Sequence, residues 1–194
     1  MSPCRGRRVT TAATGGLLLT TVCAVIAALA IPVVGTAEDA QPRPRRTSGL
    51  LSPYERTLVS VVNAERSRRG LVRLVPSAGL TAAAEHHTRR MVRLGFFDHE
   101  APGEPAFWNR IERFYPSGGW DYWAVGENLV YGSPGLEPDE ALEEWLASPP
   151  HRRSVLSKVW REVGVSAIHT QAAPGEYEND PTTVVTLDLG VRRR

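Results

Sequence analysis

Two histidines and one glutamate could form a ligand-binding or catalytic cluster in this sequence. His99 ends the segment FDH, which follows a glycine-terminated helical pattern, and His151 follows two prolines in the segment SPPHR. Glu127 lies between them in the short motif GEN and is an acid in an otherwise apolar stretch. Two imidazoles and a carboxylate are competent Zn²⁺ ligands, and the same groups can perform general acid–base chemistry without a metal. Spacing alone leaves open whether the three side chains meet.

The other histidines of the domain are weaker candidates. His86 and His87 are neighbours inside a predicted helix, where adjacent side chains point about 100° apart and cannot serve one site together. We therefore expect one of the two to be packed in the core and the other to be solvated. His169 ends a predicted strand and is expected to be exposed.

Helical spacing of apolar residues and alternating apolar runs define the elements that must position these residues. Ser52 begins the first helix with a capping box that Glu55 completes, and Gly95 ends the second. Helices come first along the chain and the clearest strands last, which favours an α+β fold with helices covering a mostly antiparallel sheet. The predicted helices span residues 53–69, 79–95, 106–115 and 138–148, and the predicted strands span residues 127–131, 163–169 and 183–191.

The N-terminal part has the pattern of a segment for export. Three arginines precede an uncharged apolar run over residues 17–34, and small residues follow, so residues 1–37 are predicted to be a signal peptide, with an uncleaved anchor as the alternative. Residues 38–52 are predicted to be a Pro/Arg-rich linker, and residues 53–194 the domain. Both cysteines, Cys4 and Cys23, fall in the first segment, so we expect a domain without disulfides. The predicted signal peptide implies that this domain is secreted or extracytoplasmic.

The charge balance argues against nucleic acid as a partner. The chain has 194 residues, and without the three arginines of the first 37 residues its 20 basic side chains face 21 acidic ones. Phosphate binding needs clustered, uncompensated Lys and Arg. We expect a monomer that contacts the membrane only through its N-terminal segment.

Five sequence blocks, taken in order, resemble the CAP superfamily, which comprises cysteine-rich secretory proteins, antigen 5 and pathogenesis-related 1 proteins. The resemblance is to its disulfide-free bacterial (SCP-like) branch and covers roughly residues 53–191. The blocks are VNAER on the first helix, then FDH, GENL, WLASPPHR and VGV. The resemblance implies a three-layer α-β-α sandwich.

The same resemblance implies a cleft lined by a His-Glu-Glu-His tetrad. Its first histidine corresponds to His99, its first glutamate to Glu127 and its last histidine to His151. Ser148 stands where animal and plant members have the second glutamate. Pro150 stands where the bacterial pattern has glycine, and because proline cannot take positive φ, we expect a different shape for the loop that presents His151.

Three roles remain open for this cluster. It could be a hydrogen-bonded network that shapes the cleft, a site for Zn²⁺ or another divalent cation held by His99 and His151 with Glu127 as a third ligand, or a catalytic site. The first role predicts a binding or interaction module. The last predicts a metal-dependent, protease-like hydrolase that uses His99, Glu127 and His151.

Aromatic residues crowd the segment between His99 and Glu127. Rigid rings with a hydrogen-bonding edge beside a polar cleft suit an apolar ligand or a sugar ring. The resemblance implies sterol or lipid binding, so a lipid-like, sterol-like or cell-wall ligand is the expected partner. The alternative is that several of the rings only pack under a long loop. The residues are Trp108, Phe114, Tyr115, Trp120, Tyr122 and Trp123.

Overall fold

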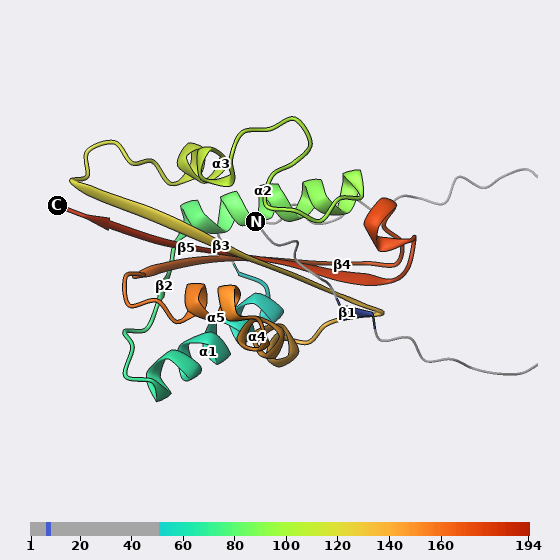
Figure 1. Ribbon diagram of the computed structural model, residues 1–194, viewed down its shortest axis with the longest axis horizontal. Helices are drawn as coiled ribbons and strands as arrows, with labels where there is room; N and C mark the ends of the chain where they lie inside the picture. The colour runs from blue at the N-terminus through green and yellow to red at the C-terminus, as the bar shows by residue number, and fades with distance from the viewer. Residues whose placement is uncertain (1–6, 9–50) are drawn as a thin grey trace, which may run out of the picture. The chain divides into compact units, whose positions relative to one another are not determined.

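The computed structural model describes residues 7–8 and 51–194, which contain five α-helices, one 3-10 helix and five strands (Figure 1). Within these residues no helix is both long and apolar enough to cross a membrane. The predicted signal peptide and linker lie almost wholly outside the described residues. The helices are α1 (Pro53–Arg68), α2 (Ala78–Leu94), α3 (Phe107–Phe114), α4 (Pro138–Ala147), α5 (Pro149–Val155) and the 3-10 helix η1 (Gly175–Tyr177), and the strands are β1 (Arg7–Arg8), β2 (Val75–Pro76), β3 (Tyr122–Ser133), β4 (Glu162–Thr170) and β5 (Thr182–Arg193).

The strands form one mixed sheet in the order β1-β3-β5-β4-β2. The long strand β5 lies at its centre and pairs antiparallel with β3 on one side and β4 on the other. The two-residue strands β1 and β2 add parallel pairs at the edges. This register places Glu127 of β3 directly opposite Asp188 of β5.

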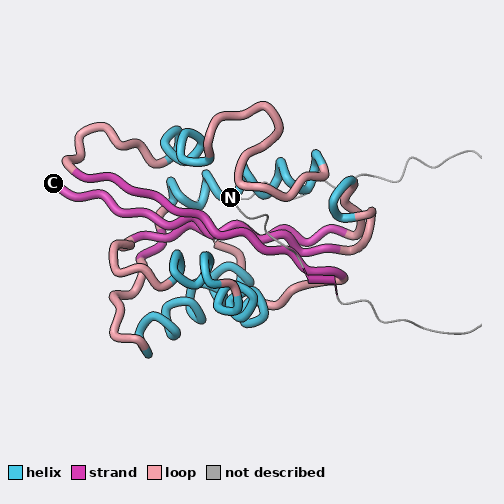
Figure 2. The backbone as a smooth tube through the Cα atoms, viewed as in Figure 1, coloured by secondary structure: helices cyan, strands magenta, loops and turns pink. Residues whose placement is uncertain are grey.

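Helices cover both faces of the sheet (Figures 1 and 2). Helices α1, α4 and α5 form one layer, whose apolar side chains, including Leu58, Trp145 and Val155, pack with Val165 and Leu187 of the sheet. Helices α2 and α3 form the opposite layer. The predicted α+β sandwich of three layers is confirmed.

The local signals in the sequence explain where the helices begin and end. At the start of α1 the Ser52 hydroxyl accepts a hydrogen bond from Glu55 N, and the Glu55 carboxylate accepts one from Ser52 N, as the capping box predicts. At the end of α2 Gly95 takes the left-handed conformation, with φ of 70°. Gly95 therefore redirects the chain toward His99.

Three predictions about the elements were wrong. The strand expected over residues 127–131 spans twelve residues, because Tyr122 to Gly126 and Gly132 also pair with β5, and Ser133 pairs with β1. The edge strand β2 was missed. The segment of His151 was expected to be a loop fixed by two prolines, but it is helix α5. Pro149 and Pro150 occupy the first turn of this helix, where the backbone N–H that proline lacks would have no partner within the helix.

The contact between α2 and β4 depends on a glycine. A Cβ built on Gly164 would lie 2.1 Å from the backbone carbon of Leu80, so the helix cannot sit at this distance over any larger residue. We expect Gly164→Ala to lower the free energy of unfolding by about 2 kcal/mol in urea titrations. Gly118→Ala is the matched control, because a Cβ there meets no atom within 4 Å. Equal stability of the two variants would contradict this packing.

Candidate functional site

The site lies between the sheet and the α2–α3 layer, where a loop and a strand bring His99 and Glu127 together. Glu127 lies near the middle of β3, and its side chain is fully buried. His99 reaches it from the loop after α2, and Nδ1 of His99 donates a hydrogen bond to Oε1 of Glu127 at 2.8 Å. The His99 side chain is 31% exposed, so it is the solvent-facing end of this pair.

Arg110 of α3 holds the other carboxylate oxygen of Glu127. Its Nη2 donates to Oε2 of Glu127, and its Nη1 donates to the backbone oxygen of His99 at 3.0 Å. Burial by itself would raise the pKa of Glu127, but the hydrogen bond from His99 and the charge of Arg110 outweigh burial and hold that pKa below its usual range. Glu127 is therefore ionised, and both its oxygens are engaged.

His87 of α2 completes the support of the loop. Nη1 of Arg110 lies 2.9 Å from Nδ1 of His87, and Nε2 of His87 lies 2.9 Å from the backbone oxygen of Asp98. An arginine only donates, so Nδ1 accepts and Nε2 carries the proton. Burial lowers the pKa of His87 to about 4, which keeps the ring neutral. His87 is the packed member of the adjacent pair, while His86 stays partly exposed.

Asp188 adds a second carboxyl group to the site. It faces Glu127 across the β3–β5 pair and is fully buried, and no N–H or O–H group of another described residue donates to its oxygens. Burial, reinforced by the neighbouring charge of Glu127, raises the pKa of Asp188 well above its usual range. Asp188 is thus the carboxyl that keeps its proton, and Glu127 is the one that gives it up.

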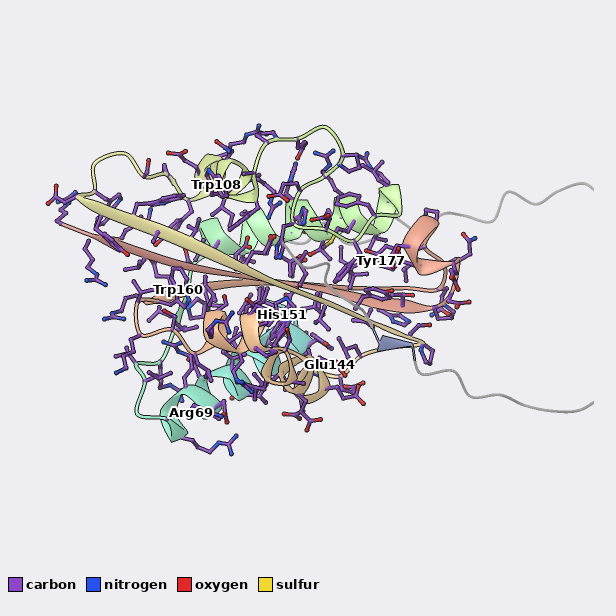
Figure 3. All side chains as sticks on the ribbon, viewed as in Figure 1. Arg69, Trp108, Glu144, His151, Trp160 and Tyr177 are labelled. Atoms are coloured by element: carbon purple, nitrogen blue, oxygen red, sulfur yellow. The ribbon has the colours of Figure 1, made fainter. Side chains whose placement is uncertain are left out.

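The other two expected cleft residues lie in the opposite helical layer. Nδ2 of Asn128 donates to the backbone oxygen of His151 on α5 at 3.1 Å, and Asn128 points to the sheet face opposite Glu127 because side chains alternate along a strand. Figure 3 shows His151 in the layer of α4 and α5. Ser148 lies at the junction of these two helices. The structure thus joins His99 to Glu127 on one face and places Ser148 and His151 on the other.

The expected divalent metal does not fit this arrangement. Among the residues that the structure describes, no three His, Cys, Asp or Glu side chains are grouped so as to hold a metal ion. Each Glu127 oxygen already accepts a hydrogen bond, one from His99 and one from the positively charged Arg110. The set of His99, Glu127 and His151 is not assembled as a three-ligand zinc site.

One of the expected aromatic residues, Trp108, is linked to His99 through Phe107. The His99 and Phe107 rings have centroids 5.8 Å apart, and Trp108 packs edge-on against Phe107 at 5.4 Å. Trp108 is 45% exposed and lies on α3 (Figure 3). Tyr122 instead stacks with Arg193, away from these contacts.

Sequence reasoning missed Arg110, His87 and Asp188 as members of the site. Asp188 carried the same signal that singled out Glu127, because it is an acid inside an apolar strand. Of His86 and His87, one was expected in the core, and no polar role was predicted for it. Arg110 had no local signal, since only the packing of α3 on the sheet brings it to Glu127.

Comparison of the sequence with models of protein families identifies the family to which this chain belongs. The sequence model described as "CAP: Cysteine-rich secretory protein family" matches residues 59–186. The chain therefore belongs to the CAP family, and the resemblance drawn from its sequence blocks is confirmed.

Its relatives include bacterial proteins of known sequence or structure. The uncharacterized protein YkwD of Bacillus subtilis is 28% identical over 120 residues, which are 62% of this chain and 44% of YkwD. The uncharacterized membrane protein YlbC of B. subtilis is 26% identical over 57% of this chain and 30% of YlbC. The matches thus span less than half the length of these curated relatives.

Two solved structures share the fold. An extracellular protein containing a SCP domain from Bacillus anthracis has a TM-score of 0.54 at 23% identity, covering 76% of this chain and 45% of that one. An outer surface protein of Borrelia burgdorferi has a TM-score of 0.57 at 20% identity, covering 71% of this chain and 92% of that one.

Proposed function

We propose that this protein is an exported binding module that holds a small, largely apolar ligand against His99, Phe107 and Trp108. The observation that carries the proposal is the engagement of both Glu127 oxygens, one by His99 and the other by Arg110. A carboxylate held in this way fixes the tautomer and the orientation of the His99 ring. The His99 ring then lies in a fixed orientation beside Phe107, which packs against Trp108, and a polar group next to aromatic rings is typical of sites for apolar ligands.

Two further observations support export. Residues 1–37 have the composition of a signal peptide. Two solved proteins of this fold are described as extracellular or outer-surface proteins. A lipid-like, sterol-like or cell-wall molecule is the ligand class that such a location and the exposed rings favour.

Fluorescence titration with two apolar probes, a dansylated fatty acid and dehydroergosterol, tests the proposal. We expect saturable binding of at least one probe, weakened about tenfold by Trp108→Ala and by His99→Ala, because each removes one side of the contact. Tyr122→Ala is the control, since it removes another exposed aromatic ring that lies away from His99. Equal loss in the control, or no saturable binding of either probe, would refute the proposed site.

A parallel titration with ZnCl₂ tests the hydrolase alternative. Binding of one Zn²⁺ at micromolar or tighter affinity, abolished by His99→Ala and by His151→Ala in folded protein, would favour a metal-dependent enzyme over a binding module. We expect no such stoichiometric binding, because His99 lies with Glu127 on one face of the sheet and His151 lies with Asn128 on the other.

A further inference from the structure

Positive charge gathers at one corner of the domain, on two segments that contribute no residue to the candidate site. Residues 66–75 and 155–161 contain six basic side chains and no acidic one. We call these two segments the basic corner. They are the end of α1 with the chain leading into β2, and the end of α5 with the chain leading into β4, and they lie side by side in Figure 1. The pairing of Val75 with Glu162 joins them.

A buried arginine fixes the two segments to each other. Nε of Arg66 donates to the backbone oxygen of Val72 at 3.0 Å, and its Nη1 donates to the backbone oxygens of Val155 at 2.6 Å and Ser157 at 3.0 Å. Arg66 is fully buried. The basic corner is therefore a preformed surface rather than two independent loops.

The charge of Arg66 is not balanced by a carboxylate. Its recorded acceptors are backbone oxygens, and its buried Nη2 has no hydrogen-bond partner among the described residues. Burial, together with the charge of Arg161, lowers the pKa of Arg66. A positive potential at this place attracts an anionic partner.

The outer side chains of the basic corner combine charge with apolar surface. Arg73 and Lys158 are exposed and form no ion pair with any residue that the structure describes. Arg69, which pairs with Glu65 and is labelled in Figure 3, lies at the outer end of α1. Val72 and Val75 are 57% and 63% exposed between these charges. A groove of about 440 Å³ continues the apolar surface from Val75 to Val59 of α1.

We propose that the basic corner docks on the headgroups of an anionic phospholipid bilayer. The phosphates would face Arg73 and Lys158, while Val72 and Val75 would enter the boundary between headgroups and acyl chains. The two exposed valines favour a bilayer over a soluble polyanion, because a polymer of phosphates offers no apolar layer to cover them. This contact is separate from the ligand site at His99 and stands whether or not that site is confirmed.

Cosedimentation of the full-length chain with vesicles tests the proposal. The vesicles contain either phosphatidylcholine alone or an equimolar mixture with phosphatidylglycerol. On the mixed vesicles we expect Arg73→Ala/Lys158→Ala to weaken partitioning about 30-fold, from roughly tenfold or less for each cation. We expect Val72→Ser/Val75→Ser to weaken it about tenfold at high as well as low salt, because the apolar contribution is not screened.

The matched control is Arg93→Ala/Arg113→Ala, which removes two exposed arginines from the α2–α3 layer. The N-terminal segment is the same in all proteins compared, so its contribution cancels in the ratios. Equal weakening by the control would show that only net charge matters and would overturn the proposal. Equal affinity of wild type for lipid-free poly(glycerol phosphate) and for the mixed vesicles would overturn it in favour of a soluble polyanion.

Discussion

Arg110→Met is expected to lower the free energy of unfolding by about 3–5 kcal/mol, because it leaves the buried Glu127 carboxylate without its cationic partner. Methionine retains most of the length and volume of the side chain, so the loss reports charge and hydrogen bonding rather than a cavity. The same change releases the backbone oxygen of His99 and Nδ1 of His87. Urea unfolding near pH 7 measures this loss of stability. We expect the loss to shrink toward pH 5, because Glu127 without Arg110 can take up a proton in the folded variant.

Two comparisons separate the ion pair from other causes. Arg110→Met/Glu127→Gln removes the buried carboxylate charge together with the arginine that balanced it. The double variant should therefore be more stable than Arg110→Met alone. Arg93→Met makes the same chemical change on an exposed part of α2 and should stay within about 0.5 kcal/mol of wild type. A double variant less stable than Arg110→Met would contradict the assignment of Arg110 as the counterion of Glu127.

Asp188→Asn is expected to stabilise the protein by about 1–3 kcal/mol near pH 8 and to have little effect near pH 4. The folded protein keeps a proton on Asp188, whereas the unfolded chain releases it once the pH exceeds the usual pKa of an aspartate. Wild type therefore loses stability as the pH rises through that window. Asparagine is uncharged at every pH, and its amide can serve as a permanent donor toward Glu127.

The measurement is the difference in unfolding free energy between variant and wild type at several pH values. His87, whose pKa burial lowers to about 4, adds a loss of stability below about pH 6.5. That loss is common to both proteins and cancels in the difference. Asp121→Asn makes the same substitution on an exposed side chain and should leave the pH dependence unaltered. A difference for Asp188→Asn that does not grow with pH would refute a protonated Asp188.

The sequence predicted those parts of the fold that depend on local chemistry. The capping box of Ser52 and Glu55 and the C-terminal glycine Gly95 act within one turn of helix, so their signals are complete in a few residues. Helix α5 was missed because a pair of prolines both ends one helix and fits the first turn of the next. The pattern over Pro149 and Pro150 does not distinguish the two cases.

The candidate site was predictable only in part, because its members come from separate elements. The resemblance to the family led us to expect His99, Glu127 and His151 in one cleft, and His99 does contact Glu127. The position of His151 depends instead on which face of the sheet α5 covers. No residue near Arg110 indicates that its guanidinium will lie on Glu127. That contact arises only when α3 packs on the sheet.

The order of strands in the sheet also bears on how the chain acquires its structure. Strand β5 follows β3 and β4 along the chain, yet it lies between them and is the long partner of both. Closing the sheet therefore requires contacts of long sequence separation, which form slowly. A chain that emerges N-terminus first cannot complete this sheet before its last strand is free. If the chain proposed here for export crosses the membrane unfolded, the sheet therefore closes only after β5 has crossed.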